Sequence, residues 1–425
     1  MAVGAAPRAA RGAVGARHRQ RARIGLALAG GGPLGGIYEV GALLALAESL
    51  RGVDLNDLDV YVGVSSGGFV AAALANGISP AQMYRLFIAE GRDAALPPAL
   101  FLRPALREFW RRAVSVPRLA AASISTFLSD PLRHGTLESF AALGRAVPTG
   151  LFDQRAIHAF LTRLLGTSGR SNDFRRLEHK LFLVATNLDT GAPVIFGAPG
   201  FDHVPIDKAI AASAALPGLF PPVEIDGEHY VDGALNKTMH ASLALRSGAK
   251  LLLCVNPLVP FDAGAATRTR RLTVDRLNHG GLPLVLSQTF RAIIHSRMQA
   301  GMQKYERQFP DADIVLFEPA REDADMFFAG IFGYSRRREL CALAFATTRA
   351  ALAARADSLE PILARHGIVL RHDRLASPRR IEDALTDPRP LHADAARPRA
   401  LAQATRELTF ALSHLERSLR ELRAR

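Results

Sequence analysis

The sequence predicts a three-layer α/β fold with an inserted helical segment and a helical C-terminal region. A short apolar strand, a glycine-rich turn and an apolar helix follow one another twice between residues 24 and 77. This order is typical of a parallel sheet with helices on its faces. The composition agrees, because 48% apolar and 22% charged residues in a chain of 425 predict a soluble protein with a large core. Disordered and fibrous classes are excluded.

The two strand–turn–helix units are defined by their apolar runs. Ile24–Ala29 is an apolar strand that stops at Gly30-Gly31-Gly32, and Gly35–Leu50 has apolar residues at helical spacing. Leu58–Val62 is the second strand, and Phe69–Leu74 begins the second helix. Both strands therefore end at glycines that could bring the backbone close to a ligand.

We expect two β-hairpins and a further strand in the middle of the chain. Turn residues at Asp189–Gly191 and at Asp226-Gly227 separate short β-prone runs. Leu251–Val255 is another buried strand, and from about residue 275 the sequence becomes helical and more charged. The runs beside the two turns are Phe182–Thr186, Val194–Phe196, Val223–Ile225 and His229–Val231.

The chain divides into parts of different composition. Residues 1–23 hold six arginines and little that a core could bury, so we expect a disordered basic tail. Residues 24–250 form the main α/β domain, and 251–425 form a mostly helical region that ends in an amphipathic helix. Within the main domain, residues 97–150 are an insertion rich in arginine and aromatic residues, which prolines such as Pro117 break up. This insertion is either a helical hairpin packed on the core or a lid or membrane-facing element.

Charge and cysteine content limit the partners. The tail carries six of the thirteen net positive charges, which leaves an ordinary excess for the other residues. No basic stripe is interleaved with aromatics, so we expect no nucleic acid. The two cysteines, Cys254 and Cys341, lie far apart, which favours a reducing compartment over a disulfide framework. No apolar run is long enough to span a bilayer, and Ile24–Ala29 is too short for the core of a secretory signal. We expect a cytoplasmic protein with peripheral contact to membranes, and the oligomeric state stays open.

Gly63-Val64-Ser65-Ser66-Gly67 fits the pattern Gly-x-Ser-x-Gly between a strand and a helix. Such a turn exposes the serine oxygen, and its glycines, here Gly63 and Gly67, let the backbone bend and the substrate approach. A serine at the start of a helix also gains acidity from the helix dipole. Ser65 is therefore the candidate nucleophile.

Residues 30–35 spell Gly-x-Gly-x-x-Gly between the first strand and its helix. This loop could bind the pyrophosphate of a dinucleotide, or its N–H groups could form an oxyanion hole. A dinucleotide site also expects an acid at the end of the second strand, where this chain has Gly63-Val64-Ser65. An oxyanion hole made of Gly30, Gly31 and Gly32 is therefore favoured, with Gly35 completing the motif.

A serine nucleophile needs a base. The chain has 13 histidines, and none lies in a local signature. Asp232 ends the strand that leaves the turn at Asp226-Gly227, and Gly233 beside it allows close approach. These residues alone leave Asp232 as either a turn aspartate or the base.

Taken together and in this order, the three motifs resemble those of the patatin-like phospholipases. That family has a Gly-Gly-Gly-x-Arg/Lys-Gly loop, a Gly-x-Ser-x-Gly turn and an Asp-Gly-Gly/Ala motif, which correspond here to residues 30–35, 63–67 and 232–234. Residues 185–191 and 211–222 also look like the family. The resemblance covers about residues 24–250 and implies a patatin-like catalytic domain there.

The resemblance implies a Ser–Asp dyad without histidine. Ser65 would attack an ester carbonyl while Asp232 takes its proton, and water activated by Asp232 would hydrolyse the acyl-enzyme. Backbone N–H groups of Gly31, Gly32 and Ser66 would hold the oxyanion. Because an aspartate with an ordinary pKa is a weak base, the scheme requires a desolvated carboxylate. The implied activity is hydrolysis of phospholipid or other acyl-ester lipid, of phospholipase A or lysophospholipase type.

Leu34 departs from the family pattern, which has a basic residue at this place. The change removes a positive charge near the turn and keeps the backbone donors. Two alternative functions stay open: an acyltransferase that uses the same serine, and a catalytically silent lipid-binding scaffold. We expect no cofactor and no metal, because the sequence has no His-Glu-x-x-His motif and no clustered ligands.

Overall fold

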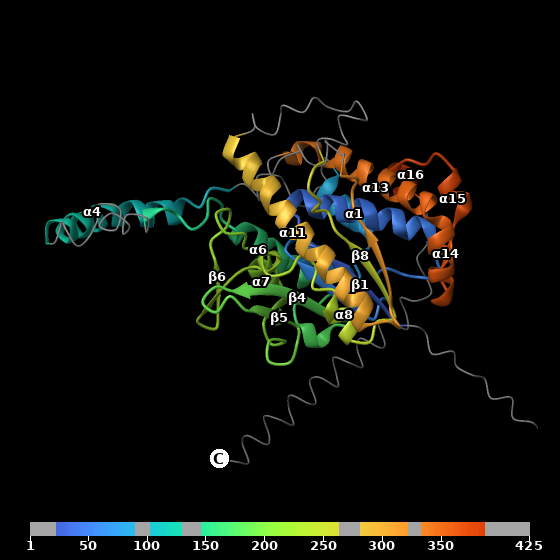
Figure 1. Ribbon diagram of the computed structural model, residues 1–425. Helices are drawn as coiled ribbons and strands as arrows, with labels where there is room; N and C mark the ends of the chain where they lie inside the picture. Colours follow the sequence, from blue (N-terminus) through green and yellow to red (C-terminus); the bar gives the residue numbers. More distant parts are fainter. Residues whose placement is uncertain (1–22, 90–102, 130–145, 263–280, 322–332, 387–425) are drawn as a thin grey trace, which may run out of the picture.

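The computed structural model describes residues 23–89, 103–129, 146–262, 281–321 and 333–386, and a mixed β-sheet forms its centre (Figure 1). The strand order is β6-β7-β4-β3-β1-β8-β9, and β5 pairs with β4 beside this path. Neighbours from β4 to β9 along this order are parallel, whereas the pairs that involve β5, β6 or β7 are antiparallel. The strands are β1 (Ile24–Leu28), β3 (Val60–Val64), β4 (Lys180–Asn187), β5 (Pro193–Phe196), β6 (Val223–Ile225), β7 (Glu228–Asp232), β8 (Leu251–Val255) and β9 (Asp313–Phe317).

Helices cover both faces of the sheet because its central strands are apolar on both sides. Successive side chains of a strand point to opposite faces. In β1, Leu26 and Leu28 join one core cluster and Ala27 joins another; in β8, Leu253 and Cys254 divide in the same way. The first cluster also holds residues of α1 (Gly32–Ser49), α2 (Ser66–Ala75) and α13 (Arg337–Ala354), and the second holds residues of α8 (Ser242–Arg246) and α11 (Gly281–Gln308). The predicted three-layer α/β fold is confirmed.

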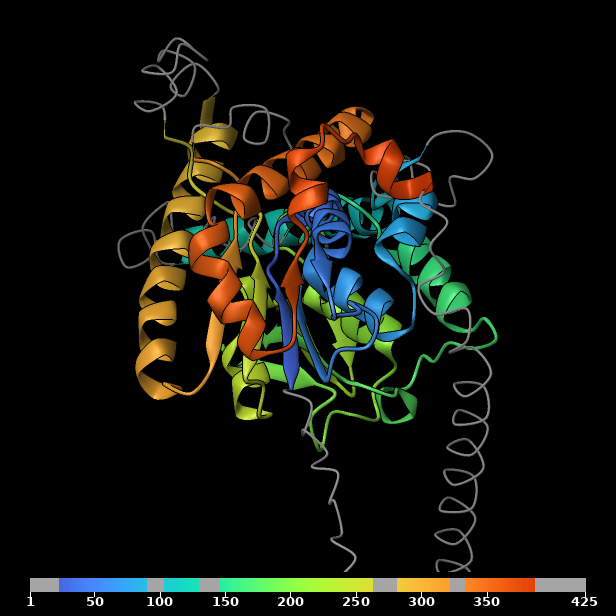
Figure 2. The same ribbon diagram turned by 90° about the vertical axis from the view of Figure 1, so that its right-hand side faces the viewer.

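The C-terminal helices pack around α1 (Figure 2). A Cβ added at Gly41 of α1 would lie 2.4 Å from the carbonyl oxygen of Cys341 in α13, so the two backbones are in close contact. A small second sheet pairs β2 (Leu50–Arg51), directly after α1, with β10 (Val369–Leu370). The helices that follow α13 are α14 (Ala356–Arg365), α15 (His372–Ala376) and α16 (Ile381–Thr386).

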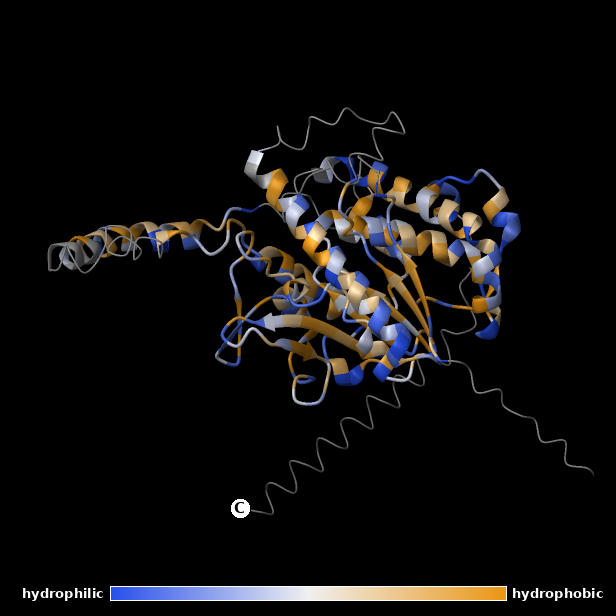
Figure 3. Cartoon of the chain, viewed as in Figure 1, coloured by the Kyte–Doolittle hydropathy of each residue, from blue (hydrophilic) through white to orange (hydrophobic). Residues whose placement is uncertain are grey.

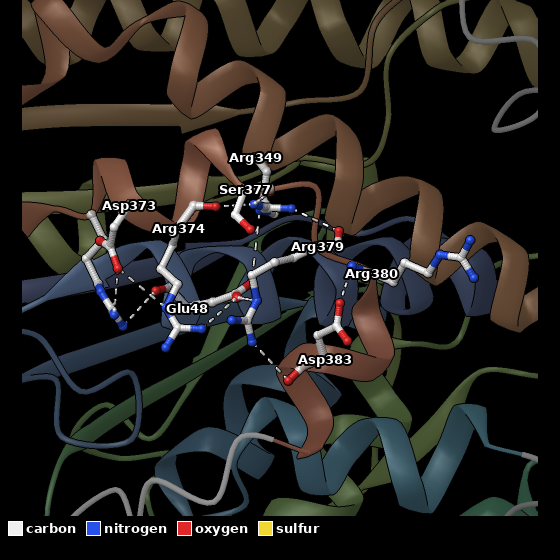
Figure 4. A network of polar contacts seen from close by, with 9 residues as sticks. Glu48, Arg349, Asp373, Arg374, Ser377, Arg379, Arg380 and Asp383 are labelled. Carbon is white, nitrogen blue, oxygen red and sulfur yellow. Dashed lines mark hydrogen bonds and ion pairs between the residues drawn. The ribbon is translucent and has the colours of Figure 1, made fainter.

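A buried acid at the end of α1 ties these C-terminal helices together (Figure 4). The Glu48 carboxylate is ion-paired with Arg379 and lies 3.9 Å from the Arg374 guanidinium and 4.0 Å from that of Arg349. Arg349 in turn donates to the carbonyl oxygens of Ser377, at 2.8 Å, and of Arg379, at 3.0 Å. One carboxylate thus joins α1, α13, α15 and the segment after α15.

The sheet continues past residue 250, where the sequence placed the end of the main α/β domain. β8 pairs with β1, and β9 pairs with β8, so the C-terminal region supplies two parallel strands of the same sheet. Without β8, the apolar strand β1 would have an uncovered edge. The strand β9 was missed at the sequence level, although the apolar run Ile314–Phe317 was a signal for it.

The described part of the inserted segment contains the long helix α4 (Leu106–Ser129), and Pro117 lies inside it. The sequence predicted that proline breaks up this segment, and for Pro117 that prediction is wrong. Proline removes the hydrogen bond to the carbonyl of Ala113, and because Ala113 is exposed, water can take the place of the lost donor. The remaining helices are α3 (Pro80–Met83), α6 (Arg155–Leu165) and α7 (Ile206–Ser213).

Two predicted segments cannot be compared with the structure. The basic tail, apart from Arg23, and the C-terminal amphipathic helix lie outside the described residues. Within the described ranges, no helix is both long and apolar enough to cross a membrane.

Candidate active site

Ser65 lies in the turn between β3 and α2, in a backbone conformation that side chains rarely adopt. Its φ is +53° and its ψ is −123°. Strain of this kind in a non-glycine residue is characteristic of a serine held at a sharp strand-to-helix turn. A Cβ on Gly63 would lie 2.4 Å from the carbonyl oxygen of Gly67, and one on Gly67 would lie 2.6 Å from that of Ala29. The pattern Gly-x-Ser-x-Gly is therefore a steric requirement of this turn.

Ser213, the last residue of α7, holds this turn in place. Its Oγ accepts a hydrogen bond from the backbone N–H of Ser65 at 2.9 Å and donates one to the carbonyl oxygen of Val184 in β4 at 2.6 Å. The Ser213 side chain is buried. The N–H of Ser65 is thereby occupied, and the serine is tied to the neighbouring strand.

Asp232 ends β7, and its carboxyl group lies close enough to the side chain of Ser65 for the hydroxyl to stabilise its charged form. Its Oδ1 also accepts the backbone N–H of Ala234 at 2.8 Å. The residue between them, Gly233, needs to be glycine, because a Cβ there would lie 2.2 Å from the carbonyl oxygen of Val184. The strand end and the turn after it thus fix the carboxylate beside the serine.

Burial raises the pKa of Asp232 to about 6. The side chain is only 2% exposed, and a charged carboxylate loses its hydration there. The nearby Ser65 hydroxyl and the hydrogen bond from the N–H of Ala234 act in the opposite direction, because both stabilise the charged form. A carboxylate with this pKa is a stronger proton acceptor than an ordinary aspartate and is still ionised at neutral pH.

The glycine loop from β1 to α1 lies against both members of this pair. A Cβ on Gly30 would lie 3.0 Å from the Cβ of Ser65 and 3.2 Å from that of Ala234. Gly32 has a φ of +63°, in the left-handed region that favours glycine. Gly31 and Gly35 both face Pro257, at 2.6 and 3.0 Å from their added Cβ atoms. A side chain at Gly30 would therefore crowd Ser65, and side chains at Gly31 or Gly35 would crowd Pro257.

The N–H groups of this loop do not all point to a substrate. The N–H of Gly30 donates to the carbonyl oxygen of Thr238 at 3.3 Å and is therefore not available to an oxyanion in this structure. Within the described residues, the N–H groups of Gly31 and Gly32 have no acceptor, because they come before the first bond within α1. The N–H of Ser66 is free in the same part of the structure, since it belongs to the first turn of α2. These three groups are the candidate oxyanion donors.

An apolar cavity of about 150 Å³ opens beside Ser65. Its walls come from α1, α2, α6 and α7, together with residues that follow α3 and α7. A site with apolar walls and few polar groups selects an apolar ligand. Representative lining residues are Ile37, Val40, Phe69, Phe87, Leu161 and Phe220.

The model of the family described as patatin-like phospholipase matches residues 26–245, just over half of the chain. The chain belongs to the patatin-like phospholipase family. Members of this family act on lipid acyl esters. The turn that holds Ser65, the glycine loop and Asp232 all lie within the matched residues.

The similarity of the chain to solved structures is low. No curated protein matches the chain. Among solved structures, VipD from Legionella pneumophila is 16% identical over 76% of this chain and 67% of its own, with a TM-score of 0.35. The type III effector ExoU is 19% identical over 79% of this chain and 53% of its own, with a TM-score of 0.33. A structure of ExoU with SpcU from Pseudomonas aeruginosa is 22% identical over 67% of this chain and 52% of its own, with a TM-score of 0.26. The chain thus spans about half the length of ExoU.

Two histidines of this patatin-like phospholipase lie near the site, and neither was singled out from the sequence. His158 lines the cavity, and its Nε2 lies 3.5 Å from Oδ2 of Asp207. His240 lies near the backbone of Gly233, and burial, assisted by the charge of Lys237, lowers its pKa to about 4. Because neither histidine lies in a local motif, only the folded chain brings them to the site.

Leu34, the departure from the family's glycine loop, is a buried core residue in α1. The side chain packs with the apolar face of the helix and leaves the backbone donors of Gly31 and Gly32 in place. In the residues that the structure describes, no group of three or more His, Cys, Asp or Glu side chains could hold a metal ion.

Proposed function

We propose that the protein is a serine lipid acyl hydrolase of phospholipase A or lysophospholipase type that works through a Ser65–Asp232 dyad. The observation that carries this proposal is a strained serine, beside a buried carboxylate with which it interacts, at the wall of an apolar cavity. A nucleophile and its base within hydrogen-bonding reach are the requirement for acyl transfer through a covalent intermediate. The cavity supplies the apolar surroundings that an acyl chain needs.

In the first half-reaction, Oγ of Ser65 attacks the ester carbonyl and its proton moves to the Asp232 carboxylate. The carbonyl oxygen becomes an oxyanion, which accepts hydrogen bonds from the N–H groups of Gly31, Gly32 and Ser66. The C–O bond to the leaving alcohol then breaks, and protonated Asp232 gives its proton to that alcohol. An acyl-enzyme on Ser65 remains.

In the second half-reaction, water takes the place of the alcohol. Asp232 accepts a proton from water while the oxygen attacks the acyl-enzyme, and the same three N–H groups hold the second oxyanion. Collapse of this intermediate returns the proton to Ser65 and releases a fatty acid. The raised pKa of Asp232 supports both proton transfers, because it brings the carboxylate closer to the pKa of its proton donors.

The test uses the Ser65→Ala variant and, as a matched control, Ser358→Ala on α14, whose hydroxyl donates to the carbonyl of Arg355 away from the site. Purified proteins are incubated with vesicles of mixed phospholipids, and products are followed by mass spectrometry. We expect fatty acid and lysolipid from wild type and Ser358→Ala, and a loss of at least about 10³-fold in Ser65→Ala.

Other outcomes of this experiment would contradict the proposal. Turnover in folded Ser65→Ala protein would remove Ser65 as the nucleophile. Acylated glycerol, when glycerol is added, would show an acyltransferase in place of a hydrolase. If none of the proteins released a product, the remaining interpretation would be a catalytically silent lipid-binding scaffold.

A further inference from the structure

Helix α4 stands away from the body of the molecule (Figure 1). Its apolar side chains are exposed: Leu106 by 71%, Trp110 by 72% and Val114 by 58%. Figure 3 shows hydrophobic residues along this arm, although no described part of the chain covers them. An exposed apolar surface of this kind marks a site of interaction.

Most of the apolar residues of α4 lie on one side of the helix. With 3.6 residues per turn, positions three, four or seven apart share a face. The residues that follow this spacing are Leu106, Phe109, Trp110, Ala113, Val114, Pro117, Ala121 and Ile124. The stripe therefore runs along most of the helix, about 27 Å at 1.5 Å per residue.

Arginines lie beside this stripe. The helix contains four arginines and one acid, Glu108. Arg111 and Arg118 are seven residues apart and so lie on the same flank, where both are exposed. Glu108 is ion-paired with Arg111 and lies 2.8 Å from Arg112. The edge of the apolar stripe is thus positively charged.

The base of α4 is connected to the walls of the Ser65 cavity. The N–H of Ala105, just before the helix, donates to the carbonyl oxygen of Leu151 at 2.9 Å. The next residue, Phe152, donates its N–H to the carbonyl oxygen of Leu219 at 2.8 Å, and Leu219 lines the cavity. Two backbone hydrogen bonds therefore join the start of α4 to a wall of the cavity.

We propose that α4 is a docking helix that lies in the surface of a bilayer containing anionic phospholipid. Its apolar stripe enters the boundary between headgroups and acyl chains, and Arg111 and Arg118 bind the phosphate groups at the rim. This proposal rests on the proposed function, because docking serves catalysis only if the bilayer also holds the ester substrate. Adsorption to a bilayer is measured without turnover, so the two proposals can fail separately.

The charges favour a bilayer over a second copy of the chain. Two α4 helices packed through their apolar stripes would bring both rows of arginines into one interface, and like charges there repel. The phosphate groups of an anionic bilayer would instead neutralise the positive charge of each arginine.

Trp110 is the single tryptophan of the chain and lies in the stripe, so the wild-type protein reports on its own docking. The full-length Ser65→Ala protein, which keeps the vesicles intact, is titrated with vesicles of pure phosphatidylcholine and with vesicles that contain phosphatidylglycerol. We expect a blue shift of the emission with phosphatidylglycerol vesicles only, quenching by brominated acyl chains, and reversal by high salt.

Two variants separate the apolar and the charged contributions. Val114→Asp should weaken vesicle binding about tenfold or more, because it places a charge in the stripe. Arg118→Glu should weaken it about fivefold or more. The matched control is Val369→Asp on β10, which changes a valine that is 48% exposed outside α4, and it should bind as the parent does. Circular dichroism checks that each variant is folded.

Three results would overturn the proposal. They are an unshifted Trp110 spectrum with every vesicle, equal binding to phosphatidylcholine and phosphatidylglycerol, and a shift that depends on protein concentration alone. The last result would assign the stripe to contacts between copies of the chain.

Discussion

Asp232 is in an environment that opposes its ionised form, which costs the folded protein stability. Burial raises its pKa from 3.8 to about 6 in the folded state. Between these two values the folded protein binds more protons at this residue than the unfolded chain does. Stability therefore falls as the pH rises through this window, by about 3 kcal/mol in total for a shift of this size.

The Asp232→Asn variant should remove this cost. We expect the variant to unfold at a higher temperature than wild type above pH 6, because the amide is uncharged and its oxygen can still accept the N–H of Ala234. Below about pH 4 the two proteins should be equally stable, since wild-type Asp232 is then protonated in both states. Melting temperatures of both proteins from pH 3.5 to 8 test this, and a difference that stays constant with pH would contradict it.

The residues of the site differ in how far the sequence alone could predict them. Ser65 and the glycines around it belong to local patterns whose geometry explains their spacing, so they could be found by reading the chain. Asp232 was ambiguous from its neighbours, and only the resemblance favoured it as the base. Ser213 and His158 act through contacts with distant segments, and no local pattern identifies them.

Among the elements, strands bounded by glycine turns were predictable, whereas the edge strand β9 and the position of α4 were not. The strands β1, β3 and β8 are short, wholly buried apolar runs, and the two hairpins have clear turn residues. β9 follows the long helix α11, and its pairing with β8 depends on contacts across the sheet. Whether α4 packs on the core depends on its surroundings in the folded chain, which periodicity cannot give.

The contact between α1 and α13 gives a prediction for two glycines of the same helix. A methyl group at Gly41 would meet the backbone oxygen of Cys341 at 2.4 Å and the Cβ of Ala344 at 2.8 Å, and neither can move alone. A methyl group at Gly36 would meet only the Cβ of Ser66, at an ordinary 3.5 Å. Gly41→Ala should therefore destabilise the protein by about 2 kcal/mol, whereas Gly36→Ala should be neutral or stabilise it by up to about 1 kcal/mol.

Chemical denaturation of the two glycine variants beside wild type measures this difference. If Gly41→Ala were as stable as Gly36→Ala, the close packing of α13 on α1 would be wrong.

At the scale of the whole molecule, α1 connects the site to the C-terminal helices. Its first turn presents the N–H groups of Gly31 and Gly32, and its last turn presents Glu48 to arginines of α13, α15 and the segment after α15. The region after residue 250 also completes the sheet beside β1. The C-terminal region therefore belongs to the folding unit that holds the site, and the protein should unfold in one cooperative transition.

Glu48→Gln tests this coupling, with Asp373→Asn as the matched control, because both acids face Arg374 (Figure 4). The side chain of Glu48 is 5% exposed, and neutralising it leaves three arginines in a partly buried cluster without their carboxylate. Breaking a buried ion pair costs about 3 kcal/mol, so the midpoint of denaturation should fall clearly. Asp373 is 68% exposed, and its removal should cost less than about 1 kcal/mol. Circular dichroism in denaturant measures both. Equal effects of the two substitutions, or a second transition in wild type, would show that the C-terminal helices fold independently of α1.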